Sequence, residues 1–265
     1  MFIIFEIKSK MKKDKNKLMI LLHRFDEARW IKSLINGKVS FSCVENFLKS
    51  YEKDGNFVRG DAFEGVFAHL PKTDDRVQKA ICELGSDLEI INDGDYVYLR
   101  RHSVKKIPIF CIYMIDGETL VKNINRAGIH DVEIFFDSRL VEGFSKCESK
   151  NDDEHINILS IYPQQFITPI TDHCFGKGII PKYDKVKYQD IHGDYYLKPT
   201  DKYEELFIKD TTYSYQHEER MILPRERVYG ENNRYDIELQ PFEYINISPV
   251  NMRLTFNIEV SEIEE

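Results

Sequence analysis

The chain has 265 residues, of which 42% are hydrophobic and 31% are charged, a globular balance that can bury a sizeable core. Its net charge of -8 argues against a surface coated in basic residues for nonspecific phosphate binding. The length suits one elaborated domain over residues 1–265.

The five cysteines are widely scattered, and no two of them form a C-x-x-C pair. The pattern therefore indicates neither a disulfide framework nor a zinc site, and a reducing compartment fits best. The histidines show no metal-ligand spacing, so we expect no bound metal. The opening apolar run is too short for a membrane span and lacks the order of a secretory signal. We expect a cytoplasmic protein with no membrane partner.

Helix and strand patterns alternate in the first half of the chain. Residues 18–25 read as a short buried strand, and the segment between Asp26 and Gly37 repeats apolar residues at helical spacing. Alternation over 38–43 predicts a half-buried strand. The other elements predicted here are helices at 44–51 and 74–84, a hairpin at 88–101 and a central strand at 107–115.

Strand patterns dominate the second half. A helix is predicted at 117–128 and an exposed loop at 145–155, and the glycine-bearing segment 171–178 also reads as a loop. The predicted strands are 131–136, 156–162, 186–190, 219–223, 235–239, 244–248 and 254–260. Helices mainly in the N-terminal half, followed by strands, favour an α+β fold.

Residues 209–224, KDTTYSYQHEERMILP, place many ionisable side chains just before an apolar run. If this segment is extended, Gln216 and Glu218 face the same side, because alternate strand residues share a face. Glu218 could instead be a solvated edge-strand carboxylate paired with Arg220. Glu219 is a rival, since a shift of one residue exchanges the two faces.

Two stretches carry a resemblance to a known family. The order strand, His-Arg, helix, Gly, strand in LLHRFDEARWIKSLINGKVSFS resembles the start of the ADP-ribosyltransferase superfamily, and QHE at 216–218 is similar to its [Gln/Glu]-x-Glu motif. The pieces GKVSFSCVENF, RGDAFEG and KDTTYSYQHEERMIL also resemble a group of uncharacterised bacterial and phage proteins. In those proteins an aromatic-rich segment ends in Glu-x-Glu-x-Arg, where this chain has Gln216 in place of the first Glu.

The resemblance implies a split β-sheet core that binds NAD+ as a substrate. Glu218 would stabilise the positive charge that develops on the ribose as nicotinamide leaves, and Gln216 would orient the acceptor. The acceptor would be RNA, DNA or a protein, as for a toxin or anti-phage defence effector, with an antitoxin as a further partner. The implied contacts to NAD+ are His23, Arg24, Ser40, Phe41, Ser42, Arg59, Tyr213 and Tyr215.

Other interpretations stay open from the residues alone. The same scaffold could be a nucleotide-binding or partner-binding protein without turnover. Asp61, Glu64 and His69 could serve a metal-dependent nuclease, although RGDAFEG also reads as a turn held by carboxylate-to-amide bonds. A nucleophile pair of His173 and Cys174 is disfavoured, because adjacent loop residues do not easily face each other.

Overall fold

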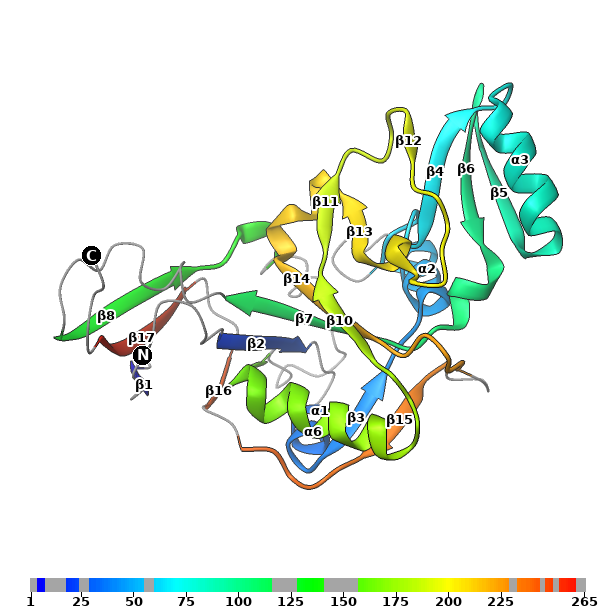
Figure 1. Ribbon diagram of the computed structural model, residues 1–265. Helices are drawn as coiled ribbons and strands as arrows, with labels where there is room; N and C mark the ends of the chain where they lie inside the picture. Colours follow the sequence, from blue (N-terminus) through cyan, green and yellow to red (C-terminus); the bar gives the residue numbers. More distant parts are fainter. Residues whose placement is uncertain are drawn as a thin grey trace. The chain divides into compact units, whose positions relative to one another are not determined.

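The computed structural model describes residues 4–7, 18–23, 29–54, 60–115, 128–140, 157–228, 233–243, 246–249 and 253–260 (Figure 1). It combines α-helices with several largely antiparallel sheets, which is compatible with the predicted α+β class. The chain forms two compact units. Unit 1 comprises Met1–Val39, Ile112–His173 and Ile237–Glu265, and unit 2 comprises Ser40–Cys111 and Cys174–Asp236. Within the described ranges, no helix has both the length and the apolar character needed to span a membrane.

Unit 1 contains two groups of paired strands. In the first, β17 (Arg253–Val260) lies between β1 (Ile4–Ile7), which is parallel to it, and β8 (Gly128–Phe135), which is antiparallel. In the second, β2 (Leu18–His23) pairs with the end of β7 (Ile109–Ile115) and with β9 (Asn157–Ile161), and β9 pairs with β16 (Asn246–Pro249). The helices are α1 (Arg29–Ile35) and most of α6 (Pro163–Gly176). The short pair of β3 (Lys38–Phe41) and β15 (Tyr235–Glu238) contributes to both units along the chain.

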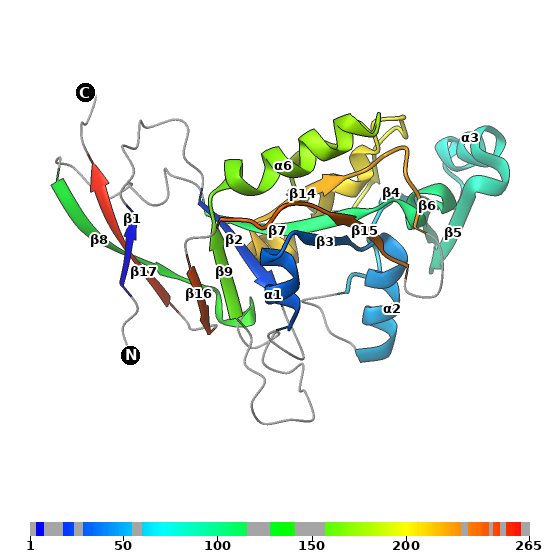
Figure 2. The same cartoon turned by 90° about the horizontal axis from the view of Figure 1, so that it is seen from below.

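One part of unit 2 is a sheet ordered β12 (Tyr195–Tyr196), β4 (Val66–Pro71), β6 (Tyr96–Arg101) and β5 (Leu88–Asp93). Helix α3 (Asp75–Leu84) packs against β4 and β5 (Figure 2). Asp74 begins this helix by accepting from the Arg76 amide at 2.8 Å, as a helix cap requires. The apolar core beneath the helix consists of Phe67, Ala68, Leu70, Val77, Ala80, Val97 and Leu99.

The other part of unit 2 contains residues 209–224, the segment with many ionisable side chains. Strand β14 (Glu218–Ile222) pairs with β10 (Lys182–Lys185), and β13 (Ile208–Asp210) pairs with β11 (Lys187–Gln189). The remaining elements are helix α2 (Val44–Asp54) and four short 3-10 helices, η1 (Gly85–Asp87), η2 (His102–Lys106), η3 (Glu204–Phe207) and η4 (Thr211–Gln216). Their core includes Val44, Val104, Ile107, Ile109, Leu206, Phe207 and Ile222.

Most predicted elements are confirmed, with α1, α2, α3, the 88–101 hairpin and the central strand β7 close to their expected places. The loop prediction for 171–178 is wrong over 171–176, because α6 extends through Gly176. This helix begins with Pro163, where its missing N–H costs nothing, but its internal Pro169 obscures the helical pattern. Strands β1, β4, β10, β12 and β13 had not been predicted. The predictions at 117–127 and 145–155 lie outside the described residues.

Candidate functional site

The backbone around Gln216 and Glu218 differs from the expected continuous strand. Asp210 begins η4 by accepting from the Thr212 amide at 2.9 Å, and η4 continues through Gln216. His217 then takes a left-handed conformation with φ 40°, and β14 starts at Glu218. The alternation argument for pairing Gln216 with Glu218 is therefore wrong. Their side chains nevertheless converge, because both bond to the same lysine.

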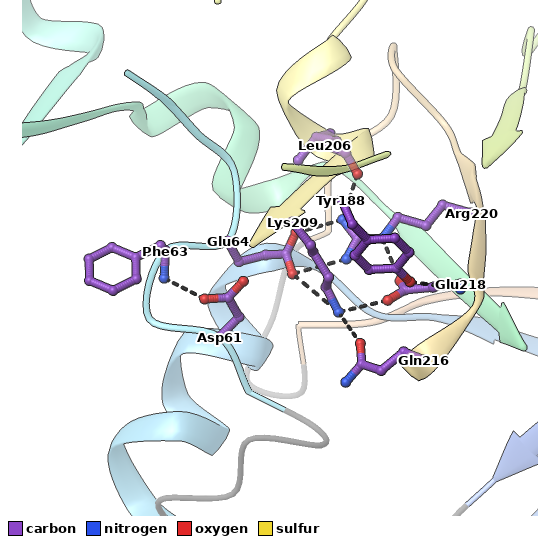
Figure 3. Close-up of polar contacts among 9 residues, drawn as sticks. All are labelled: Asp61, Phe63, Glu64, Tyr188, Leu206, Lys209, Gln216, Glu218 and Arg220. Atoms are coloured by element: carbon purple, nitrogen blue, oxygen red, sulfur yellow. Dashed lines mark hydrogen bonds and ion pairs between the residues drawn. The ribbon is translucent and has the colours of Figure 1, made fainter. Parts of the chain in front are cut away.

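Lys209, on β13, is the centre of this convergence (Figure 3). Its Nζ donates to Gln216 Oε1 at 2.7 Å and to Glu218 Oε2 at 2.6 Å. Glu64 Oε2 lies 3.9 Å from the same nitrogen, and the Tyr213 ring centroid lies 5.4 Å from it. One ammonium group is thus surrounded by an amide oxygen, two carboxylates and an aromatic ring.

Arg220 holds the other side of the two carboxylates. It lies two residues after Glu218 on β14, and its Nε donates to Glu218 Oε1 at 2.5 Å. Its two terminal nitrogens donate to the two oxygens of Glu64 at 2.5 and 3.0 Å, a forked geometry that suits arginine. Arg220 also donates to the Leu206 carbonyl at 2.5 Å and is fully buried. We call Glu64, Lys209, Gln216, Glu218 and Arg220 the charge cluster.

The charge cluster keeps Glu218 ionised despite its burial. Burial alone would raise the pKa of Glu218, but Arg220 and Lys209 lower this pKa well below its ordinary value. Burial would likewise lower the pKa of Lys209, but Glu218 and Glu64 raise it. The interpretation of Glu218 as an ion-pair partner of Arg220 is confirmed, whereas its expected solvent exposure is wrong, since the residue is 7% exposed.

Asp61 lies beside the charge cluster in the loop before β4 (Figure 3). Its Oδ1 accepts from the Phe63 amide at 2.8 Å, so the turn predicted for this loop is confirmed at Asp61. Its Oδ2 is buried without a hydrogen-bond partner. Burial and the negative charge of Glu64 raise the pKa of Asp61 to about 6. Gly60 precedes it, where a Cβ would lie 2.4 Å from the Tyr51 amide nitrogen, so only glycine fits there.

The two predicted aromatic contacts, Tyr213 and Tyr215, lie on η4 and are largely buried. Glu219, the rival to Glu218, bonds instead to the hydroxyl group of Tyr183 on the paired strand β10. On β14 it points to the opposite face from Glu218 and Arg220, because successive strand residues alternate between the two faces. Tyr188 on β11 accepts from the Glu218 amide at 2.9 Å and so holds the first residue of β14.

Three of the remaining predicted contacts to NAD+, which are Ser40, Phe41 and Ser42, have other partners. Phe41 is fully buried and packs edge-on against Phe110 and Tyr235 in the core. Ser40 Oγ accepts from Arg234 at 3.4 Å, and Ser42 Oγ accepts from Asn46 at 3.2 Å.

Three more of the predicted contacts cannot be compared with the charge cluster. His23 ends β2 in unit 1, and its side chain is outside the described part of the structure. Arg24 and Arg59 lie outside the described residues altogether.

The residues of the nuclease alternative lie in different surroundings. His69 Nδ1 faces the Gly193 carbonyl at 2.9 Å and His69 Nε2 faces Asp93 at 3.2 Å, whereas Asp61 and Glu64 lie at the charge cluster. In the described ranges, no three His, Cys, Asp or Glu residues form a group that could hold a metal ion.

His173 and Cys174 are consecutive residues of α6 rather than loop residues. Their side chains leave the helix in different directions, because neighbours in a helix do not share a face. The helical conformation thus also disfavours a nucleophile pair at this position.

Sequence reasoning did not identify Lys209 as part of the site. Lys209 opens the segment KDTTYSYQHEER, but it reaches Glu218 from a separate strand, which local spacing does not reveal. Comparison with protein-family models, curated proteins and solved structures gave no significant match. The case for a function therefore depends on the chemistry of the charge cluster. An ionised carboxylate beside an amide can bind a polar ligand and stabilise positive charge, while Lys209 and Arg220 hold the carboxylate in place.

Proposed function

We propose that the protein is an NAD+-dependent ADP-ribosyltransferase in which Glu218 is the catalytic carboxylate. The observation that supports this is the buried Glu218, held ionised at the first residue of β14 with the Gln216 amide converging on it through Lys209. In this reaction the bond between the ribose and nicotinamide breaks and its electron pair leaves on the nicotinamide nitrogen. The ribose carbon gains positive charge, which a nearby carboxylate stabilises.

Glu218 retains the capacity to accept a further hydrogen bond. Arg220 donates to its Oε1 and Lys209 to its Oε2, and the Cys111 thiol also bonds to the carboxylate. A carboxylate offers about four lone-pair sites in total, so a ribose hydroxyl could donate to Oε2 beside Lys209. Gln216 would then orient the acceptor, whose lone pair forms the new bond to the ribose carbon and whose proton passes to solvent.

The central test is the release of nicotinamide from NAD+ by purified variants. Because Glu218→Gln removes the charge that the transition state requires, we expect a rate at least about 100-fold lower. Glu219→Gln is the matched control and should retain wild-type activity, since Glu219 bonds to Tyr183. Glu218→Asp keeps the charge and tests its position, with circular dichroism reporting whether each variant is folded. Full activity in folded Glu218→Gln would refute the proposal.

A second candidate is a nucleotide-binding protein without turnover, as the 7% exposure of Glu218 and its two cationic partners also suit a fixed recognition site. Calorimetric NAD+ binding with no release of nicotinamide would favour this candidate. For the transferase, incubation with labelled NAD+ and a whole-cell extract identifies the acceptor. We expect label in RNA, DNA or protein with wild type and none with Glu218→Gln, as for a toxin or anti-phage effector.

A further inference from the structure

The loop Asp190–Asp194 joins β11 to β12 and carries a histidine that the proposed reaction does not use. His192 Nδ1 lies 2.5 Å from the hydroxyl oxygen of Tyr98 on β6. Its Nε2 lies 3.8 Å from Asp210 Oδ2, and the ring meets the edge of Phe63 at 5.1 Å. The side chain is 47% exposed, so its ring can exchange protons with solvent.

Asp210 connects this histidine to the charge cluster. It follows Lys209 directly, and its Oδ1 accepts from the Thr212 amide at the start of η4, the turn that carries Tyr213 and Gln216. Burial would raise the pKa of Asp210, but the amides of Thr212 and Ile191 and the imidazole of His192 lower it below its ordinary value. Asp210 is thus an ionised carboxylate that fixes the beginning of η4 and faces His192.

We infer that His192 is a positioning residue whose imidazole ring, held by Tyr98, faces Asp210 and fixes the η4 turn beside Lys209. Its catalytic consequence rests on the proposed function, but its effect on η4 does not. The titratable groups around the ring are Tyr98 of β6, Asp210 of β13 and Asp190, which accepts from the His192 amide at 2.8 Å.

Hydrogen–deuterium exchange tests the positioning role without any substrate. In His192→Gln, which keeps a polar side chain but cannot become cationic, we expect the amides of residues 212–216 to exchange about twofold to fivefold faster at pH 6. Tyr98→Phe, which removes the hydroxyl group that holds the ring, should act in the same direction. His102→Gln, at an exposed position of η2, is the control and should exchange like wild type. Unchanged exchange in His192→Gln would overturn the inference.

Turnover of NAD+ gives the functional readout. We expect kcat in His192→Gln to fall about twofold to fivefold at pH 6 with little change in KM, because a turn that positions Gln216 is loosened. If Glu218→Gln is fully active, the proposed function fails while the exchange experiment still decides the role of His192. If Glu218→Gln is inactive and His192→Gln exchanges and reacts like wild type, only the inference about His192 fails.

Discussion

The first residue of β14 and the 3-10 helix η3 each bury a glutamate against an arginine, with different results. Glu218 has a cation on each oxygen, Arg220 on Oε1 and Lys209 on Oε2, and its pKa is lowered. Glu205 meets Arg101 through Oε1 alone, its Oε2 has no hydrogen-bond partner, and burial raises its pKa.

The comparison teaches that the number of cationic donors decides the direction in which the pKa of a buried acid shifts. One arginine does not offset the desolvation of Glu205, whereas two cations more than offset that of Glu218. Asp61 resembles Glu205, because it too has an oxygen without a partner and a raised pKa. Glu218 is therefore kept ionised, whereas burial makes the charged forms of Glu205 and Asp61 costly.

Removing Arg220 should have the largest effect on stability. In Arg220→Met, Glu64 and Glu218 would share Lys209 alone, so we expect the free energy of unfolding to fall by about 3–5 kcal/mol. Urea denaturation measures this loss. The control is Arg76→Met, whose ion pair with Asp74 is partly exposed, so its loss of stability should be much smaller. Similar small losses in both variants would show that the charge cluster is not stabilising.

Asp61 should make stability depend on pH in the opposite sense to Glu218. Its pKa is raised from 3.8 to about 6, so the folded state binds the proton more tightly than the unfolded chain. Its contribution is fully present below about pH 4 and is lost as the pH rises through 6, an effect of up to about 3 kcal/mol. Asp61→Asn keeps the acceptor for the Phe63 amide and should remove this dependence between pH 4 and 8. Denaturation curves that are parallel for the two proteins at every pH would refute the assignment.

Neutralising Glu218 and Glu205 one at a time should show how much the second cation stabilises Glu218. Glu218→Gln leaves Lys209 and Arg220 without their shared counter-charge, whereas Glu205→Gln removes a charge that burial already disfavours. We expect Glu218→Gln to cost about 2 kcal/mol more than Glu205→Gln in the free energy of unfolding at pH 7. Equal losses would mean that the second cation gives Glu218 no advantage.

The smallest effect should come from the neighbouring acid, Glu219. Tyr183→Phe removes its hydroxyl partner on β10 and should cost about 1 kcal/mol. Nicotinamide release should not change, because Glu219 faces the opposite side of β14 from Glu218. A drop in activity as large as that of Glu218→Gln would identify Glu219 as the catalytic acid.

Elements with strong local signals could be predicted from sequence. The hairpin at 88–101 and helix α3 follow from turn residues, a capping Asp74 and apolar spacing, all of which act over a few residues. Helix α6 was not predicted, and its last residues were assigned to a loop, because Pro169 and the glycines near residue 176 obscure a helical pattern. Strand β10 was missed, as its lysines and aspartate hide a strand pattern.

The site was only partly predictable for a physical reason. Gln216 and Glu218 were identified from residue types, but the geometry that joins them comes from Lys209 on another strand and from Glu64, far away in the chain. The left-handed conformation of His217 gives only a weak sequence signal, since few non-glycine residues adopt it even though histidine does so more often than most. Gln216 and Glu218 do lie close together, as predicted, but because both bond to Lys209 and not because they alternate along one strand.

His217 has a consequence for how this segment tolerates variation. Its φ of 40° is a conformation that β-branched side chains avoid and glycine adopts freely. In a library randomised at codon 217 and selected for folded protein, glycine and asparagine should be enriched while valine and isoleucine disappear. That enrichment profile would report the left-handed backbone conformation of residue 217, between η4 and β14.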